Sequence, residues 1–349
     1  MIDFLPVALV ILLIINMRVV KPLNATNEDC LSREASQYYR GFFALVVVLH
    51  HLSQKAAEGV FFPVFLHAGS LAVSFFFFLS GYGLQKSFMA KPEIYRKNYL
   101  KKRIPAVLIP YVVFVFIYWL VNAVVGKRYS ISDICIGFVN GSPIVSYSWY
   151  IIVILVFYLF FGLFMFLCRK KPKMTVLYGC AWYIVWVLFC YKTDYNIWWY
   201  STAHLLLLGM IWATYEIQIN RIIKKHYVFL ALVSWIGFIL LFALQDIIIP
   251  LLPHQFIATL LWQFLLSLLF VCGVLFLFRK MIIGNQILGF LGGISLEIYL
   301  VHGLYIQIIQ IQNAFVWCLS VISLSLVTAY LLHIVLSYVL KKYRNMMHL

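Results

Sequence analysis

The sequence predicts an all-α, polytopic integral membrane protein with about 11 transmembrane helices, its N-terminus outside and its C-terminus inside. Hydrophobic residues make up 64% of the 349 residues and charged residues only 11%, and the mean hydropathy is +0.97. A soluble domain does not tolerate that composition. The formal net charge of +16 does not indicate a nucleic-acid partner, because the basic residues lie between apolar stretches and have no soluble domain to sit on.

Apolar stretches of membrane-spanning length follow one another along the chain. The first is interpreted as an anchor and not as a signal peptide, because Asp3 stands where a basic segment is expected and no small-residue cleavage site follows. Residues 1–36 then form an additional N-terminal anchor with a polar connector. The expected spans are at about residues 4–20, 40–51, 66–84, 104–125, 150–167, 174–191, 201–215, 228–249, 256–278, 286–309 and 315–340.

The positions of Lys and Arg predict the orientation, because cytoplasmic segments are enriched in both residue types. With these spans, the basic groups that lie inside are 18–40, a loop at 86–103, 169–173, 221–225, 279–280 and 341–344. The basic residues that lie outside are Lys55, Lys127, Arg128 and Lys192. Adding or removing one span would place the later groups on the wrong side.

The stretch YYRGFFALVVVLHHL at 38–52 carries the first candidates for chemistry, Arg40 and His51. A helix turns about 100° and rises about 1.5 Å per residue, so these two residues return to within about 20° of one stripe, about 16 Å apart. His50 lies about 80° off that stripe. An arginine at the membrane interface and hydrogen-bonded histidines would also explain the pattern, but ionisable groups at membrane depth usually line a pathway or a site.

The predicted topology gives the other candidates a depth. Trp149, Tyr150 and His302 belong to the outer surface or outer half, whereas Ser80 lies near the basic segment 86–103 on the cytoplasmic side. That arrangement suits a reaction with a phosphate-bearing donor bound inside and an acceptor that reaches a general base from outside. The basic segment alone is also explained by topology.

Glu297 is the carboxylate that lies well inside a predicted span, and it stands about 140° round the helix from His302. It either orients a partner on another helix or forms a structural hydrogen bond. The pair Gly292 and Gly293 indicates either close helix packing or a helix break. The seven cysteines have no metal-like spacing, so we expect no metal.

Six ordered segments resemble the membrane-bound acyltransferase 3 family, integral-membrane proteins that mainly O-acylate glycans. The segments are RGFFALVVVLHH, AVSFFFFLSGYGL, NYLKKRIPAVLIPYVV, SWYIIVILVFYLFF, AHLLLLGMIWA and ISLEIYLVHG. The first matches the family's Arg-x10-His motif, which falls on Arg40 and His51. The resemblance implies that residues 37–349 form an acyltransferase 3-like transmembrane domain.

The resemblance also implies an activity. Acyl-CoA, expected to be acetyl-CoA, would donate from the cytoplasm to a hydroxyl of a cell-surface or lipid-linked glycan. His51 would be the general base, Arg40 its electrostatic partner, and Arg103 with Lys101 and Lys102 the donor-side contact. The family commonly has a second basic residue three positions after Arg103, where this chain has Ala106. Ser80, Trp149, Tyr150, Glu297 and His302 remain further substrate-pocket candidates.

Two other function classes compete with an enzyme. In a transporter or exporter of a polysaccharide or lipid-linked glycan, the same buried charges would line a path. A scaffold is disfavoured because the chain has no sizeable soluble domain. A covalent acyl-enzyme is an alternative to direct transfer. Membrane lipids are the other expected partner, and the expected location is the cell membrane, which in a bacterium is the cytoplasmic membrane.

Overall fold

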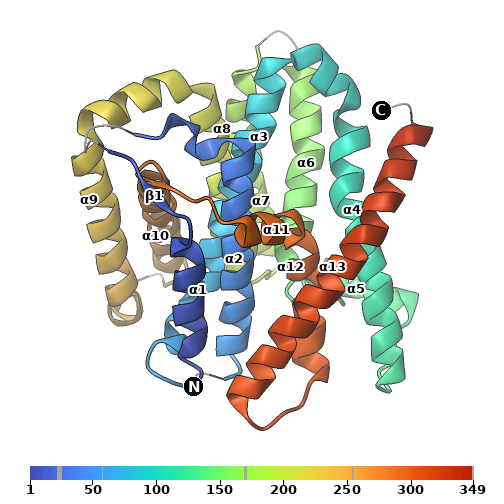
Figure 1. Ribbon diagram of the computed structural model, residues 1–349. Helices are drawn as coiled ribbons and strands as arrows, with labels where there is room; N and C mark the ends of the chain where they lie inside the picture. Colours follow the sequence, from blue (N-terminus) through green and yellow to red (C-terminus); the bar gives the residue numbers. More distant parts are fainter. Residues whose placement is uncertain (22–25, 57, 169–170, 254, 348–349) are drawn as a thin grey trace.

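The computed structural model is a bundle of helices, and it describes residues 1–21, 26–56, 58–168, 171–253 and 255–347 (Figure 1). Its α-helices are α1 (Phe4–Ile14), α2 (Arg33–Ser53), α3 (Ala68–Ala90), α4 (Pro92–Val124), α5 (Ile131–Val139), α6 (Trp149–Leu167), α7 (Met174–Lys192), α8 (His204–Thr214), α9 (Glu216–Ile248), α10 (Gln255–Phe278), α11 (Gln286–Gly293), α12 (Ser295–Ile308) and α13 (Ala314–Met346). The 3₁₀ helices are η1 (Glu28–Leu31), η2 (Phe62–His67), η3 (Ile197–Trp199) and η4 (Ile249–Leu251). Two short strands, β1 (Arg18–Val19) and β2 (Met281–Ile282), pair antiparallel.

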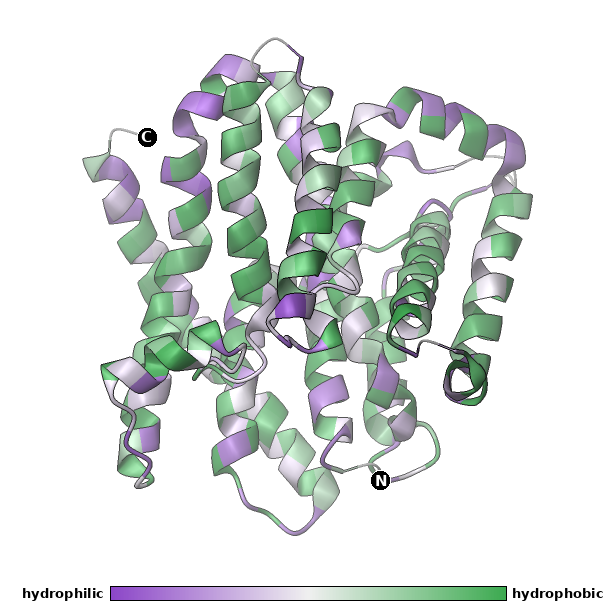
Figure 2. Cartoon of the chain, turned by 180° about the vertical axis from the view of Figure 1, so that it is seen from behind, coloured by the Kyte–Doolittle hydropathy of each residue, from purple (hydrophilic) through white to green (hydrophobic). Residues whose placement is uncertain are grey.

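The all-α class is confirmed, and the long apolar helices are consistent with a polytopic membrane protein. Within the described residues, 7 helices are long and apolar enough to cross a membrane, or 8 if the bent pair α11 and α12 counts as one span. Helices α1 and α8 have 11 residues each, which is about half of the length that a bilayer core requires. The count of about 11 spans and the orientation therefore stay predictions. Apolar residues cover most of the helix lengths, and hydrophilic ones gather toward their ends (Figure 2).

The first predicted span, 4–20, is wrong in its extent. Helix α1 ends at Ile14, and Asn16 adopts a left-handed conformation with φ of 60°, which asparagine tolerates better than most residues. Arg18 and Val19 then pair with Ile282 and Met281. An apolar helix of half length, followed by paired backbone, thus replaces the expected full-length anchor. Residues 22–25 of the predicted connector lie outside the described part of the chain.

The basic segment 86–103 is also different from the prediction, because it is helical and not a loop. Helix α3 continues to Ala90 and α4 begins at Pro92. Proline suits a first helical position, and lysine and arginine are good helix formers. This turn and the end of α13 lie at one end of the bundle, which we call the basic end (Figure 1). Arg169 and Lys170 of another predicted basic group lie outside the described residues.

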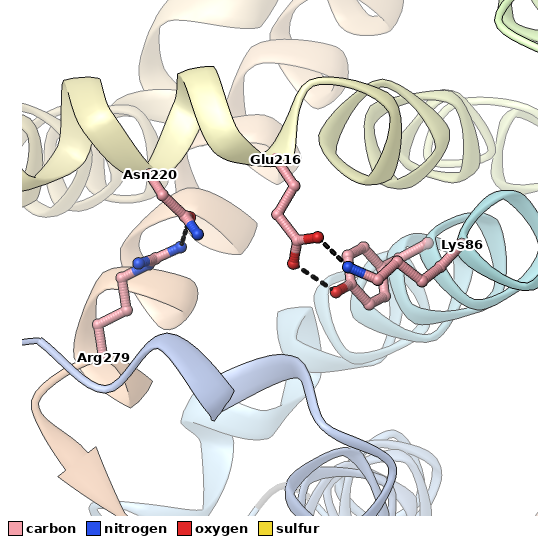
Figure 3. Close-up of polar contacts among 5 residues, drawn as sticks. Lys86, Glu216, Asn220 and Arg279 are labelled. Atoms are coloured by element: carbon pink, nitrogen blue, oxygen red, sulfur yellow. Dashed lines mark hydrogen bonds and ion pairs between the residues drawn. The ribbon is translucent and has the colours of Figure 1, made fainter. Parts of the chain in front are cut away.

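Polar contacts join three helices at the basic end (Figure 3). Glu216, at the start of α9, accepts a hydrogen bond from the hydroxyl of Tyr82 at 2.7 Å and pairs with Lys86 of α3. Next to it, Arg279 donates to the side chain of Asn220 and so connects the end of α10 to α9. Helix α9 then bends at His226, where φ is −124° and ψ is 25°. The bend allows the first part of α9 to cross the basic end before the rest runs down the bundle (Figure 1).

Helix α2 lies in the interior of the bundle, where it contacts α3, α11 and α12. The approach to α11 is close enough to require glycine. A Cβ atom on Gly292 would lie 1.8 Å from the carbonyl oxygen of Gln37, and one on Gly41 would lie 2.1 Å from that of Leu288. Helices α11 and α12 meet at an angle of 75°. Both interpretations of the Gly292 and Gly293 pair therefore hold, because Gly292 packs closely against α2 and Gly293 ends a helix.

Candidate active site

Arg40 and His51 line two different cavities along α2. Arg40 lines a cavity of about 730 Å³ near the basic end. His51 lies deeper along the helix, 8% exposed, and lines a cavity of about 550 Å³ toward the opposite end. The helical spacing that predicted one stripe for these residues thus places a cation in one chamber and an imidazole in the next.

The larger cavity, which we call the basic cavity, is rich in positive charge. The cationic residues that line it are Arg33, Arg40, Lys86 and Arg103. Among the described residues that line it there is no carboxylate. Arg40 uses its Nε to donate to the carbonyl of Ser36 at 3.2 Å, and its terminal nitrogens make no hydrogen bond within the described part of the chain. They are free for an anion, and a guanidinium fork matches phosphate oxygens well.

The other residues predicted to contact the donor do not all line the basic cavity. Ser80 and Arg103 line the basic cavity. Lys101 and Lys102 are exposed on α4 and line neither the basic cavity nor the cavity at His51. Successive residues on a helix point about 100° apart, so one residue of the run can face inward while its neighbours face outward. The sequence alone does not reveal which residue of such a basic run faces inward.

The second cavity, which we call the histidine cavity, has a different character. Its polar lining includes His50, His51, Gln54 and His67. Aromatic residues complete it, namely Tyr147, Trp149, Trp198, Trp199 and Tyr299. Indole and phenol rings offer flat apolar faces together with a hydrogen-bonding edge. Such a lining suits a ligand with both polar hydroxyls and apolar faces.

Tyr299 of α12 is the one described residue that lines both cavities. It is 4% exposed, and its hydroxyl donates to the backbone carbonyl of Tyr147 at 2.6 Å. Sequence reasoning did not select Tyr299, although it lies inside ISLEIYLVHG, one of the segments singled out. A tyrosine in an apolar helix has no spacing signal of its own, so only the fold identifies it as a shared wall.

The start of α6 is deeper than the sequence suggested. Trp149 lines the histidine cavity and Tyr150 lines the basic cavity, so these neighbours lie at the level that separates the two and not at an outer surface. The preceding loop packs inward, with Tyr147 in a left-handed conformation at φ of 63°. Its ring stacks on His51 with centroids 3.7 Å apart.

His302 of α12 packs beside this pair, with its ring centroid 5.2 Å from that of His51. It is 0% exposed. Its Nδ1 lies 3.2 Å from the carbonyl oxygen of Ile298, and its buried Nε2 has no hydrogen-bond partner among the described residues. His302 therefore packs beside the stacked rings of His51 and Tyr147 and does not line the histidine cavity itself.

Glu297 lies outside both cavities. Its Oε1 accepts a hydrogen bond from Nδ1 of His333, on α13, at 2.8 Å. Glu297 thus has a partner on another helix, and this contact is compatible with both alternatives, the orientation of that partner and a structural hydrogen bond. His333 was not a candidate, because a contact between α12 and α13 leaves no spacing signal in the sequence.

The family model described as an acyltransferase domain matches residues 34–341. The chain belongs to the acyltransferase 3 family. Arg40 and His51 both fall inside the matched part, as do all other residues of the two cavities except Leu31 and Arg33. Searches of curated proteins and of solved structures gave no significant match. Membership of the acyltransferase 3 family, together with the apolar helices, makes this chain a multi-pass membrane acyltransferase.

Proposed function

We propose that this protein is an O-acyltransferase that moves an acyl group, expected to be acetyl, from acyl-CoA to a hydroxyl of a cell-surface or lipid-linked glycan. The observation that carries the proposal is the pair of cavities on one helix, a cationic one at Arg40 and an aromatic one at His51, with Tyr299 as their shared wall. The basic end is the cytoplasmic side, following the enrichment of lysine and arginine on that side of membranes.

The donor binds in the basic cavity. Coenzyme A carries phosphate groups, and Arg40, Arg103 and Lys86 supply cationic donors around a volume of about 730 Å³. The thioester is at the far end of a long flexible arm from those phosphates. With the phosphates held at the basic end, the arm extends along α2 toward Tyr299 and brings the thioester to the wall between the cavities.

The acceptor binds in the histidine cavity, where tryptophan and tyrosine faces can pack on sugar rings. Nε2 of His51 takes the proton from the acceptor hydroxyl as its oxygen attacks the thioester carbonyl. The new C–O bond forms, the C–S bond breaks, and the leaving thiolate of CoA takes up the proton from the His51 imidazolium. Arg40 holds the donor by its anionic groups and takes no part in the proton transfer.

The test is transfer of labelled acetyl from acetyl-CoA into lipid-linked or surface glycan, with membranes that carry wild type or His51→Ala at matched abundance. We expect a loss of at least about 100-fold in the variant, the usual contribution of a general base. His226→Ala is the matched control, because it removes an exposed histidine that lines neither cavity.

Each outcome has a distinct meaning. Normal transfer by His51→Ala would reject His51 as the base. If wild-type membranes transfer neither acetyl nor longer or acidic acyl groups, and glycan export changes instead, the transporter is the better description. In that case the two cavities would be alternating halves of one path.

A further inference from the structure

Two polar side chains of the histidine cavity, His50 and Gln54, have no role in the proposed reaction but are connected to His51. Nδ1 of His50 lies 2.8 Å from the backbone carbonyl oxygen of Phe65. Nε2 of the same ring lies 3.2 Å from Nε2 of Gln54. Oε1 of Gln54 lies 3.1 Å from Nδ1 of His51. A chain of three hydrogen bonds therefore begins at a main-chain carbonyl and ends on the proposed base.

The direction of every bond in this chain follows from its first member. A carbonyl oxygen can only accept, so Nδ1 of His50 carries a hydrogen and, in the neutral ring, Nε2 is an acceptor. The group that faces this acceptor must be the NH₂ of Gln54. The amide oxygen of Gln54 then faces His51, and as an acceptor it requires the hydrogen on Nδ1 of His51.

The remaining nitrogen of His51 is therefore the basic one. Nε2 of His51 has no hydrogen-bond partner within the described part of the chain, and unlike Nε2 of His302 it is not among the fully buried unpartnered atoms. The ring of Tyr147 covers one face of the imidazole, with an interplanar angle of 20°. Because His51 lines the histidine cavity, Nε2 is the nitrogen that a hydroxyl of a ligand there can reach.

We propose that His50 and Gln54 are positioning residues that hold His51 in the Nδ1–H tautomer and keep Nε2 as the proton acceptor. The inference rests on the proposed role of His51 as the base. An amide cannot take up the proton that His51 receives, so the proton stays on His51 until the leaving thiolate removes it. The amide oxygen keeps its hydrogen bond to Nδ1–H before and after proton transfer, which holds the ring in one orientation throughout.

Two pairs of variants test the chain. Gln54→Leu and His50→Phe keep side-chain bulk but remove the hydrogen bonds, and we expect kcat to fall about 10-fold with the KM for acetyl-CoA unchanged, as for the loss of one orienting hydrogen bond. Gln54→Glu keeps the oxygen that faces His51, and His50→Gln keeps a side chain that can both donate and accept. Each of these conservative variants should recover part of the lost kcat.

A measurement apart from activity addresses the tautomer directly. In protein labelled with ¹⁵N-histidine, the His51 resonances, assigned with His51→Ala, should report a protonated Nδ1 and a bare Nε2 in wild type. A mixture of both tautomers is expected in Gln54→Leu. Gln312→Leu is the matched control, because it removes an amide from an exposed position outside both cavities.

The failure of this inference can be separated from failure of the proposed function. If His51→Ala abolishes transfer while Gln54→Leu and His50→Phe keep the wild-type kcat and tautomer, the positioning role is rejected and the base remains. If Gln54→Leu changes the tautomer but His51→Ala transfers normally, the chain exists and the function assigned to His51 is wrong. A Gln54→Leu protein that does not fold leaves the decision to His50→Phe and to the tautomer in wild type.

Discussion

The hydroxyl of Tyr299 donates a hydrogen bond to the backbone carbonyl of Tyr147 at 2.6 Å, and this bond joins α12 to the loop before α6. The same loop places the ring of Tyr147 on His51. This one hydrogen bond therefore holds both Tyr299, which lies between the two cavities, and the ring of Tyr147, which covers His51. Displacing Tyr299 would disturb the two features together.

Tyr299→Ala should connect the cavities and let water reach the donor thioester. We expect hydrolysis of acetyl-CoA without acceptor to rise above the wild-type level while transfer to glycan falls. Tyr299→Phe keeps the ring and loses one hydrogen bond, so a fall in transfer of about 3- to 10-fold is expected. The measurement is release of free CoA with and without glycan acceptor.

Tyr305→Phe provides the control for the Tyr299 variants. Tyr305 lies on the same helix, and its hydroxyl lies 2.6 Å from that of Thr328 outside both cavities. It should behave like wild type in both assays. Unchanged hydrolysis and normal transfer in Tyr299→Ala would show that this side chain is not the barrier.

Arg103→Ala should raise the KM for acyl-CoA by about 10-fold or more, because a charge-assisted hydrogen bond to the donor is lost. The kcat at saturating donor should change little. Lys101→Ala and Lys102→Ala are the controls, because both side chains are exposed and outside the basic cavity. Initial rates over a range of donor concentrations check this. An equal rise in KM for all three would mean that the donor lies along the outside of α4.

Glu297 and His333 should matter for stability more than for catalysis. Removal of their hydrogen bond by Glu297→Gln or His333→Ala should lower the free energy of unfolding by about 1–3 kcal/mol, with the KM values unchanged. The apparent melting temperature in detergent measures the effect. Glu93→Gln, which removes an exposed ion pair within α4, should have little effect. A loss of kcat at equal amounts of folded Glu297→Gln protein would place Glu297 in the chemistry.

The carboxylate of Asp3 accepts hydrogen bonds from the backbone N–H groups of Val60, Phe61 and Phe62, at 2.9, 2.8 and 3.0 Å. The bond from Val60 is the largest of the effects that lower the pKa of Asp3 below its usual value. A carboxyl group with a lowered pKa contributes stability above its unfolded pKa, about 3.9. That contribution is lost as the pH falls through the lower, folded pKa.

Asp3→Asn should therefore loosen the segment at 60–62 at neutral pH, and wild type should resemble the variant only once the pH falls below the folded pKa of Asp3. Amide hydrogen exchange of these residues, referenced to an unstructured peptide at each pH, measures the change. Asp246→Asn is the control, because the side chain of Asp246 makes no hydrogen bond with the described residues. Equal protection of 60–62 in Asp3→Asn and wild type would mean that the contact does not hold the segment.

Helical spacing was sufficient to predict the relation between Arg40 and His51, because both lie on α2 and the geometry of one helix is local. The same arithmetic separated Glu297 from His302. It could not identify Arg103 as the inward member of its basic run, since that depends on how α4 rotates against its neighbours. The predictions for the length of the first helix and for the 86–103 segment were wrong because hydropathy reports only how strongly a segment avoids water. It does not show where backbone pairing ends a helix, as after α1, or where a break at Lys91 and Pro92 separates two helices.

The positioning chain and the shared wall were beyond sequence reasoning for a different reason. His50 meets the carbonyl of Phe65 only because η2 folds back over the end of α2. Tyr299 reaches both cavities only because α12 turns sharply from α11. Both features depend on contacts between segments that are distant in the sequence or differently oriented. Such contacts leave no recognisable pattern in an apolar sequence.

Tyr299 lines both cavities, and this shared wall has an electrical consequence. When water fills the cavities on either side, the low-dielectric barrier is thinner than the full hydrocarbon core of about 30 Å. A membrane potential then falls mainly across the layer of protein between the cavities, where it is worth about 2.3 kcal/mol per elementary charge at 100 mV. Any charge that forms or moves between the two chambers during turnover would experience most of that voltage, so the rate should depend on the energised state of the membrane.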